Sequence, residues 1–380
     1  MIQNPLLELE ALGQSIWIDF LRRETTRSGE LKRLIEEDGV SGVTSNPSIF
    51  EKAIAESHDY DESIRVLNSE GKTAADIFQS LAVEDIQQVA DLLRPTYDHT
   101  DGQDGFVSLE VSPTLAHDTQ GTIREARRLW SQVNRPNCMI KVPATREGLP
   151  AIKQLISEGL NINITLLFGL PRYREVANAY IAGLEALAGQ GKGVRRISSV
   201  ASFFLSRIDT FLYPLIEKRI GTVGSQAEIA ARLQGQVAIA SAKVAYQIYK
   251  EMFGSQRFQR LVDQGARSQR LLWASTSTKN PAYIDTKYID PLIGPNTINT
   301  MPIETLNAYR DHGQPKQTLE ENVAEAHQVF LDLPALGIDL DKATQQLEDQ
   351  GVQKFSDSLN KLMASLQEKQ AALLGSQLEK

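Results

Sequence analysis

The 380-residue sequence has few of the residues that build disulfides and metal centres. Its single cysteine, Cys138, excludes an intrachain disulfide and any site made of several cysteines. Its five histidines are too far apart along the chain for a local zinc motif. We therefore expect no metal centre, and a cytoplasmic location is the simplest interpretation of so little cysteine.

The sequence also lacks long apolar runs and an excess of basic residues. No run approaches the length of a bilayer span, and the N-terminal segment lacks the charged and apolar regions of a signal peptide. The formal net charge is −8, whereas nucleic-acid binders concentrate basic residues on one face. We expect neither a membrane nor a nucleic-acid partner. A hydrophobic content of 41% is typical of a globular protein, and the length suffices for a sizeable core.

The stretch Cys138–Thr145 (CMIKVPAT) is typical of a short apolar strand with a lysine at its centre. Side chains on a strand alternate between faces, so Lys141 shares one side with Met139 and Pro143. The stretch has no acidic residue, so the lysine must find a partner elsewhere in the fold or lose its charge, because burial of an unpaired ammonium lowers its pKa. A lysine of that kind is a nucleophile for Schiff-base chemistry. A structural ion pair, or a side chain that reaches water, would explain the same pattern.

Seven further apolar segments have strand character, and helical segments separate them without hairpin signals. With the lysine stretch they cover residues 15–20, 42–50 (turning into a helix at Asn46-Pro47), 105–111, 138–145, 162–168, 196–204, 271–276 and 297–301. This alternation favours a parallel α/β sheet, and eight strands close a (β/α)₈ TIM barrel. The one glycine cluster, 189–193, follows a helix and precedes a strand, which is the wrong order for the phosphate loop of an open doubly wound sheet.

We predict one barrel domain over residues 1–380 with extra helices, because a plain barrel needs only about 250 residues. The surplus falls after strands two, six and eight. Ser48 is the expected cap of the helix after strand two, and residues 225–253 are expected to form one long helix. Residues 317–380 are predicted to be a helical extension packed on the barrel. Its last helix is expected to begin at Ser356, with an apolar stripe of Phe355, Leu359, Leu362, Leu366 and Leu373.

Polar residues stand at the ends of these strands, where barrels carry their chemistry. Singly, each has an ordinary structural explanation, such as a helix cap or a turn. Together, two carboxylates, a lysine and several hydroxyl or amide groups on one rim indicate a catalytic site. The residues are Asp19, Asn46, Glu110, Lys141, Asn163, Thr165, Ser202 and Ser275.

The chemistry of this set is coherent. If Lys141 attacks a ketone, the resulting carbinolamine must lose water, and Glu110 could protonate the departing hydroxyl through a water held by Thr165. Cleavage of the adjacent carbon–carbon bond requires a base for the hydroxyl one carbon further on, and Asp19 is the carboxylate left for that task. The iminium serves as the electron sink, so the reaction needs no metal or organic cofactor.

Two basic residues could bind an anionic tail of the substrate. Arg207 follows strand six where a helix begins, and helix N-termini attract anions. Lys279 follows strand seven, near the usual phosphate site of barrels. A phosphorylated sugar fits both, although two solvated surface cations would give the same pattern.

At this point the sequence resembles the transaldolase family, in its longer bacterial branch. The matching motifs span most of the chain in order: GVTSNPSIF (42–50), VSLEVSP (107–113), IKVPAT (140–145), NITLLF (163–168), SVASFFLSRID (199–209), LWASTSTKNPAYIDT (272–286) and NTINTMP (296–302). The resemblance implies a class I aldolase-type barrel that moves a dihydroxyacetone unit from sedoheptulose 7-phosphate to glyceraldehyde 3-phosphate, giving erythrose 4-phosphate and fructose 6-phosphate. It places the enzyme in the non-oxidative pentose phosphate pathway.

The resemblance also implies a role for each matching residue. Lys141 would form the Schiff base, Asp19 would be the acid and base of bond cleavage, and Glu110 with Thr165 would activate water. The substrate-binding residues would be Asn46, Asn163, Ser202, Arg207, Ser275 and Lys279. One position departs from the family pattern: the shorter branch has an arginine two residues after the strand-seven serine, and this sequence has Ser277 there, with Lys279 two residues further on.

Two other functions fit parts of the same sequence. A fructose 6-phosphate aldolase would release free dihydroxyacetone, but the members of that group are much shorter than this chain. A catalytically silent barrel could bind sugar phosphates, but it would have no use for both carboxylates. The sequence leaves open whether the protein is a monomer or a homodimer, and whether the C-terminal helix covers the site.

Overall fold

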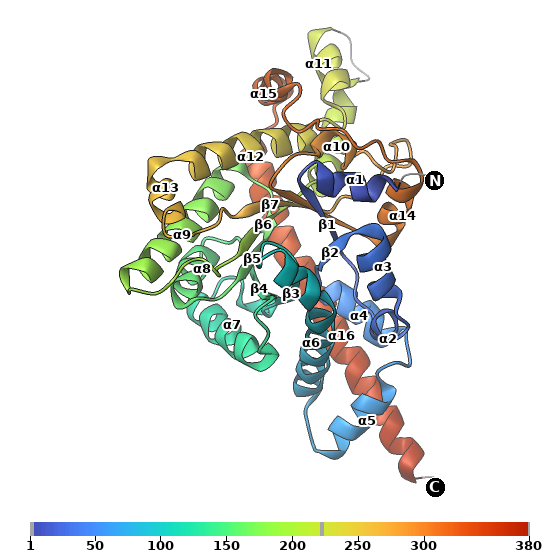
Figure 1. The fold of residues 1–380 in the computed structure, drawn as a ribbon. Coiled ribbons are helices and arrows are strands. Elements are labelled where there is room, and N and C mark those ends of the chain that lie inside the picture. The colour runs from blue at the N-terminus through green and yellow to red at the C-terminus, as the bar shows by residue number, and fades with distance from the viewer. Residues whose placement is uncertain (1–3, 221–223, 379–380) are drawn as a thin grey trace.

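The computed structural model describes residues 4–220 and 224–378. Its strands are all parallel and follow one another in chain order, and β8 pairs with β1 to close a barrel (Figure 1). The predicted eight-stranded barrel is confirmed. The strands are β1 (Gln14–Ile18), β2 (Val40–Val43), β3 (Phe106–Glu110), β4 (Cys138–Pro143), β5 (Ile162–Leu167), β6 (Ser199–Phe204), β7 (Arg270–Ala274) and β8 (Thr297–Met301).

Helices connect the strands around the outside of the barrel (Figure 1). Before β3 lie α1 (Pro5–Ala11), α2 (Arg23–Arg27), α3 (Glu30–Asp38), α4 (Pro47–Ala55), α5 (Asp61–Ser69) and α6 (Ala74–His99). Between β3 and β7 lie η1 (Pro113–Leu115), α7 (Thr119–Val133), α8 (Gly148–Glu158), α9 (Leu170–Gly189), α10 (Ser206–Ile220), α11 (Ser225–Leu233), α12 (Val237–Gly254) and α13 (Gln256–Val262). After β7 come η2 (Asp290–Leu292), α14 (Ile303–His312), α15 (Val323–Asp332), η3 (Leu333–Leu336) and α16 (Leu340–Leu378).

Three predicted helix features are wrong. The segment 225–253 is two helices, because Gly235 between them adopts a left-handed φ of +66° that a helix interior does not allow. The last helix begins at Leu340, so Ser356 lies inside it and its Oγ donates to the Val352 carbonyl at 2.9 Å. Asn46 caps α4 in place of Ser48, because its side chain accepts hydrogen bonds from the Ser48 and Ile49 amides.

The predicted apolar stripe of the last helix is largely buried. Phe355, Leu362 and Leu366 are buried and Leu359 is partly buried, whereas the Leu373 side chain lies outside the described part of the chain. The 39-residue helix α16 packs against α4, α6, η1, β5 and α10, which follow or flank the strand ends. It then extends past α5, as Figure 1 shows in red.

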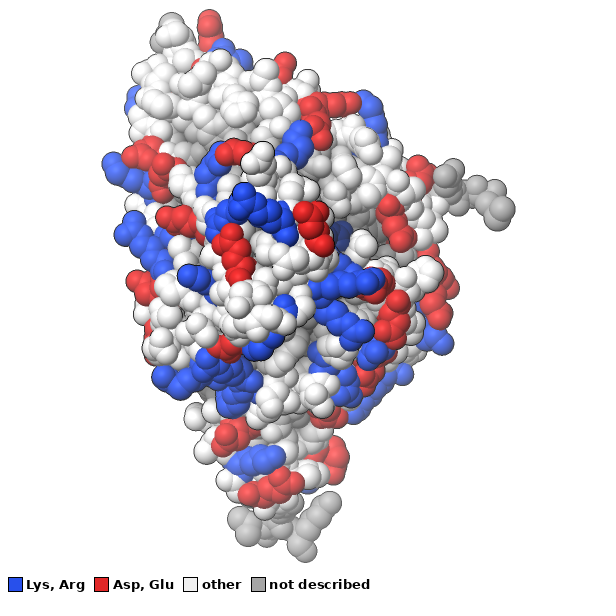
Figure 2. All heavy atoms as spheres, turned by 60° about the vertical axis from the view of Figure 1, so that its left-hand side comes forward, with Lys and Arg blue, Asp and Glu red and all other residues white. Residues whose placement is uncertain are grey.

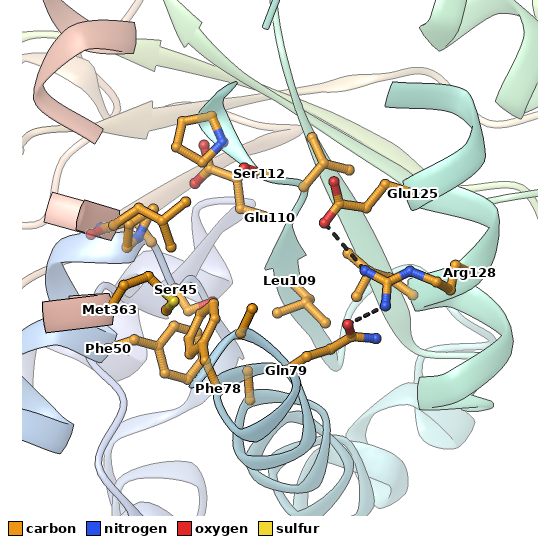
Figure 3. Close-up of a pocket in the computed structure, with 18 residues that line it drawn as sticks. Ser45, Phe50, Phe78, Gln79, Leu109, Glu110, Ser112, Glu125, Arg128 and Met363 are labelled. Carbon is orange, nitrogen blue, oxygen red and sulfur yellow. Dashed lines mark hydrogen bonds and ion pairs between the residues drawn. The ribbon is translucent and has the colours of Figure 1, made fainter. Parts of the chain in front are cut away.

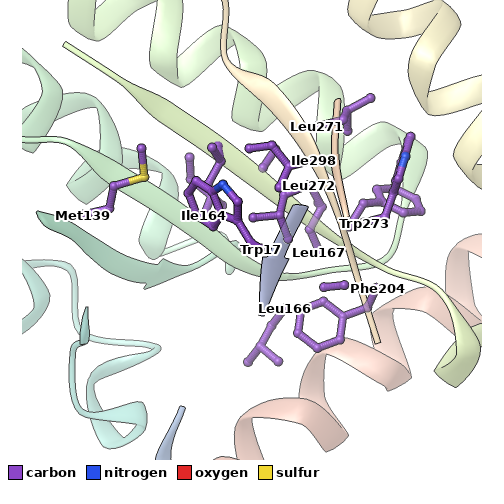
Figure 4. Packing of buried hydrophobic residues seen from close by; sticks show 14 of the residues in the cluster. Trp17, Met139, Ile164, Leu166, Leu167, Phe204, Leu271, Leu272, Trp273 and Ile298 are labelled. Atoms are coloured by element: carbon purple, nitrogen blue, oxygen red, sulfur yellow. The ribbon is translucent and has the colours of Figure 1, made fainter. Parts of the chain in front are cut away.

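The N-terminal end of the barrel is closed by a polar cluster below an apolar plug. Asp104 accepts a hydrogen bond from Trp17 Nε1 at 2.7 Å and one from Arg270 at 3.2 Å. Arg270 also donates to the Thr297 carbonyl at 2.9 Å, which ties β7 to β8. Above this cluster the Trp17 indole packs with Leu272 and other core side chains (Figure 4). Barrel enzymes carry their chemistry at the opposite end, where the strands terminate.

The outer surface is mixed in charge. Figure 2 shows acidic and basic side chains interspersed over the face that it draws. No described helix combines the length and the apolar content needed to cross a bilayer.

Gly42 provides a test of the apolar plug, because β2 passes directly beside Trp17. A Cβ at this position would overlap the Trp17 ring atoms. Gly42→Ala is therefore expected to lower the free energy of unfolding by about 3 kcal/mol, as over-packing does in tight cores. Urea denaturation monitored by tryptophan fluorescence would measure it. Gly189→Ala is the matched control, since a Cβ there meets nothing within 4 Å; equal stability of the two variants would contradict the packing argument.

Candidate active site

Lys141 lies in the middle of β4, whose six residues are all buried. The residue is only 4% exposed, and its Nζ donates to the Ser45 carbonyl at 3.1 Å. The nearest carboxylate is Glu110 on β3, with Oε2 3.6 Å from Nζ. The partner that the sequence required from elsewhere therefore comes from the neighbouring strand. At 3.6 Å the two groups form an ion pair but not a hydrogen bond.

Glu110 faces Lys141 because the two are register partners across β3 and β4. Its side chain is 3% exposed, and neither carboxyl oxygen has a hydrogen-bond partner in the described chain. Burial raises its pKa to about 7, and the negative charge of Asp19 acts in the same direction, while Lys141 and Arg207 oppose the shift. A pKa near neutrality suits a group that both gives and takes protons.

An apolar pocket explains the burial of Glu110. The pocket has a volume of about 180 Å³ and lies beneath α16, next to the strand ends. Phe50, Phe78, Leu109 and Met363 line it together with Glu110 (Figure 3). The carboxyl is thus solvated poorly on this side, which favours its neutral form.

Thr165 is the second buried group without a partner in the described chain. It is fully buried on β5, beside Pro143 of β4, and its Oγ1 makes no hydrogen bond. The pairing of β5 with β6 is irregular immediately after it, where Leu166 adopts a left-handed φ of +57°. Such irregularities bend a strand end and re-aim the neighbouring side chains, and they concentrate at functional sites.

Asp19 directly follows β1 and is held by residues of two other strand ends. Its Oδ1 accepts a hydrogen bond from Thr44 Oγ1 at 2.7 Å, and that hydroxyl also lies 2.9 Å from Thr300 Oγ1. The Asp19 amide donates to the Met301 carbonyl at 2.9 Å. These contacts fix the carboxylate at the inner rim of the barrel.

Asn163 and Ser202 belong to one buried hydrogen-bond chain. Asn163 Nδ2 donates to Ser108 Oγ at 2.9 Å, and its Oδ1 accepts from Ser202 Oγ at 2.7 Å. Asn163 is also the register partner of Lys141 across β4 and β5. The structure therefore brings these two predicted residues together next to the lysine.

Asn46 and Ser275 have structural contacts as well as a place at the strand ends. Asn46 Oδ1 accepts from the Ser48 amide at 3.0 Å, which orients the side chain at the start of α4. Ser275 follows β7 with a left-handed φ of +56°, and its Oγ lies 2.8 Å from Ser206 Oγ at the start of α10.

Arg207 and Lys279 lie near the same rim. The Arg207 guanidinium is 5.1 Å from the Phe204 ring centroid and 5.9 Å from that of Phe355. Burial lowers its pKa, while the carboxylates of Asp19 and Glu110 partly offset the effect. Lys279 is exposed as a whole residue, and its Nζ donates to Ser277 Oγ at 2.7 Å. Partial burial of its ammonium group and the charge of Arg207 lower its pKa.

Four residues of the site were not predicted from the sequence. Their roles are to orient the predicted groups, through the Ser45 carbonyl and the hydroxyls of Thr44, Ser108 and Thr300. All four lie inside the motifs quoted above, so their closeness in sequence to the predicted residues is the signal that could have identified them. Within residues 4–220 and 224–378, no three histidine, cysteine or acidic side chains form a group that could hold a metal ion.

A closed eight-stranded parallel barrel with polar side chains gathered around a buried lysine is the architecture of a barrel enzyme. The model of the Transaldolase/Fructose-6-phosphate aldolase family matches residues 16–366, so the chain belongs to this family. A transaldolase of Trichodesmium erythraeum is 48% identical over 97% of this chain and 98% of its own length. Transaldolases of Frankia alni and Mycobacterium bovis are 45% and 46% identical over 96% and 95% of this chain, and 97% and 96% of their own lengths. The predicted family, and with it the transaldolase class of enzyme, is confirmed.

The raised pKa of Glu110 predicts how stability depends on pH. The folded protein binds the Glu110 proton more tightly than the unfolded chain does. The stabilisation from this proton is therefore complete below pH 4.5 and is lost as the pH rises through about 7. Relative to Glu110→Gln, the wild type should lose about 2–3 kcal/mol of unfolding free energy across this window. Urea titrations at several pH values would measure the difference. Glu62→Gln, whose side chain is 73% exposed, is the control; parallel pH profiles for wild type and Glu110→Gln would contradict the assignment.

Proposed function

We propose that this chain transfers a dihydroxyacetone unit from sedoheptulose 7-phosphate to glyceraldehyde 3-phosphate through a Schiff base on Lys141. The products would be erythrose 4-phosphate and fructose 6-phosphate, as in the non-oxidative pentose phosphate pathway. One observation carries the proposal: a lysine that is 4% exposed lies 3.6 Å from a carboxyl with a pKa of about 7, at the open end of the barrel.

In the first step the amine nitrogen of Lys141 adds to the ketone of the donor. Nitrogen bonds to the carbonyl carbon, and a proton passes from nitrogen to the carbonyl oxygen to give a carbinolamine. Glu110 is the acid that protonates the departing hydroxyl, so that water leaves and an iminium forms. A water between Glu110 and Thr165 would give the unpartnered buried oxygens of both side chains a hydrogen-bond partner and would relay this proton.

In the second step Asp19 removes the proton from the hydroxyl on the carbon β to the iminium carbon. The bond between the α and β carbons breaks, its electron pair neutralises the iminium as an enamine, and the β carbon leaves as the aldehyde product. The acceptor aldehyde then binds, the enamine carbon attacks it, and Asp19 returns the proton. Hydrolysis of the new iminium, with Glu110 acting in the reverse sense, frees Lys141.

Polar residues around the lysine would hold the substrate in this orientation. Asn46, Asn163 and Ser202 would contact its hydroxyl groups, since Asn46 follows β2, Asn163 is the register partner of Lys141 within β5, and Ser202 of β6 donates to Asn163. The phosphate would bind at Arg207, Ser275 and Lys279, where α10 begins. A helix N-terminus adds favourable electrostatics for an anion.

We further propose that residues 1–380 act as one domain, with residues 317–380 as its C-terminal extension. The contacts of α16 with α4 and β5 support this organisation. A cytoplasmic protein that acts on small sugar phosphates, as a monomer or a homodimer and without a nucleic-acid partner, is consistent with the single buried cysteine and the net charge of −8.

Borohydride trapping tests the role of Lys141. With fructose 6-phosphate and borohydride, peptide mass mapping should find a reduced three-carbon adduct on Lys141, because borohydride reduces the imine to a stable amine. Lys243 is the control within the chain: it is also buried, 6% exposed, but its Nζ donates to the Thr318 and Glu321 carbonyls. An adduct on Lys243 in place of Lys141 would reject the proposed site.

The same experiment separates transfer from release. Incubation with fructose 6-phosphate alone should give about one equivalent of product per chain, and turnover should require an acceptor aldehyde. Steady release of free dihydroxyacetone without an acceptor would favour the aldolase activity instead. Folded protein without any adduct would favour the silent barrel.

Asp19→Asn should separate Schiff-base formation from bond cleavage. We expect a loss of turnover of about 10²–10⁴-fold, typical of removing a general base, with a trapped adduct that still carries the six-carbon sugar phosphate. The adduct mass on Lys141 reports the result. Thr44→Val, which removes only the hydroxyl that orients Asp19, should lose less activity; a three-carbon adduct in Asp19→Asn would assign bond cleavage to another residue.

A further inference from the structure

One face of α16 lies over the open end of the barrel. A Cβ on Gly351 would be 2.8 Å from Leu166 Cδ2, so the helix backbone passes close to the end of β5. One turn further on, the Phe355 ring centroid is 5.9 Å from the Arg207 guanidinium carbon. At the next turn, Ser358 Oγ lies 2.7 Å from Ser48 Oγ of α4.

Lys354 belongs to this face. It is three residues after Gly351 and four before Ser358, spacings that place side chains on the same side of a helix. It directly precedes Phe355 and is exposed at the rim. The charge of Arg207 is the largest cause of a lowered Lys354 pKa, followed by burial and by the charges of Lys279 and Lys52. The position in the helix and the electrostatics both place Lys354 beside the cations of the proposed phosphate site.

These cations lack acidic partners. Within the described residues, no ion pair to a carboxylate at 4.0 Å or less involves Arg207, Lys279, Lys354 or Lys52. Other lysines of the same helix are paired: Lys342 lies 3.1 Å from Asp339, and Lys369 lies 2.9 Å from Asp61. Asp19 and Glu110 act on Arg207 only from beyond ion-pair distance, so the like charges of this cluster destabilise one another and raise the affinity for an anion.

We propose that Lys354 is a substrate-binding residue, which contacts the phosphate of donor and acceptor together with Arg207 and Lys279. The C-terminal helix thereby supplies a cation to the site, at an edge where Ser277 carries no charge. This inference rests on the proposed function and adds a specificity determinant to it. Lys354 distinguishes phosphorylated from unphosphorylated substrates and takes no part in the chemistry at Lys141.

Two acceptors that differ only in the phosphate provide the test. With fructose 6-phosphate as donor, Lys354→Gln should lower kcat/KM for erythrose 4-phosphate by about 10-fold, the effect of losing one charge-assisted contact. For unphosphorylated erythrose, kcat/KM should change by less than about twofold, because the rest of the site is intact. In the same variant the inhibition constant of inorganic phosphate should rise in parallel with the loss of kcat/KM for the phosphorylated acceptor.

Matched variants complete the experiment. Lys354→Arg keeps the charge and should restore most of the discrimination, whereas Lys361→Gln removes an exposed charge two turns further along α16 and should leave both acceptors unchanged. The inference would be overturned if Lys354→Gln, with unaltered circular dichroism, changed kcat/KM equally for the two acceptors or changed it for neither. Borohydride trapping on Lys141 in the wild type keeps the two proposals separate: its failure would reject the function itself.

Discussion

The buried pair of Lys141 and Glu110 is the constraint on which the rest of the site depends. Two ionisable groups that are each less than 5% exposed lie 3.6 Å apart, and among the described residues the lysine donates a direct hydrogen bond only to the Ser45 carbonyl. Removing these charges from water is costly, so the protein must hold the pair in one geometry, and burial favours the uncharged form of the carboxyl. The raised pKa of Glu110 is the direct consequence, and it matches a reaction that first protonates and later deprotonates water.

The barrel provides that geometry because its two ends differ. At the N-terminal end, Trp17, Asp104 and Arg270 form a closed, hydrogen-bonded base. At the other end the strands present Asp19, Lys141 and further polar groups to one space, and their alternation fixes which side chains face inward. A helix from the far end of the sequence, α16, then packs beside this opening. The candidate catalytic groups therefore lie on the sheet or directly after its strands, while a helix outside the sheet packs against β5.

Regular patterns in the sequence were sufficient for most of the fold. The eight apolar strands predicted the barrel, and the polar residues near the strand ends predicted Lys141, Glu110 and Asp19 as site residues. The misses have local causes. A helical apolar spacing across 225–253 conceals the turn at Gly235, which only the backbone conformation reveals. Ser356 resembles a helix cap, but a serine within a helix can equally bond to the carbonyl four residues earlier, as this one does.

The sequence by itself determined the class of the fold and the family, because these follow from periodicity and from residue types at fixed spacings, and it predicted the reactive groups from the same pattern. Only the tertiary structure decided which partners those groups have. The carbonyl that binds Lys141 is 96 residues away in the chain, the hydroxyl that holds Asp19 is 25 residues away, and Phe355 lies near Arg207 although a large part of the C-terminal half separates them. Such contacts depend on register and on helix packing, and no local pattern encodes them, since each arises from where two distant segments happen to meet in space.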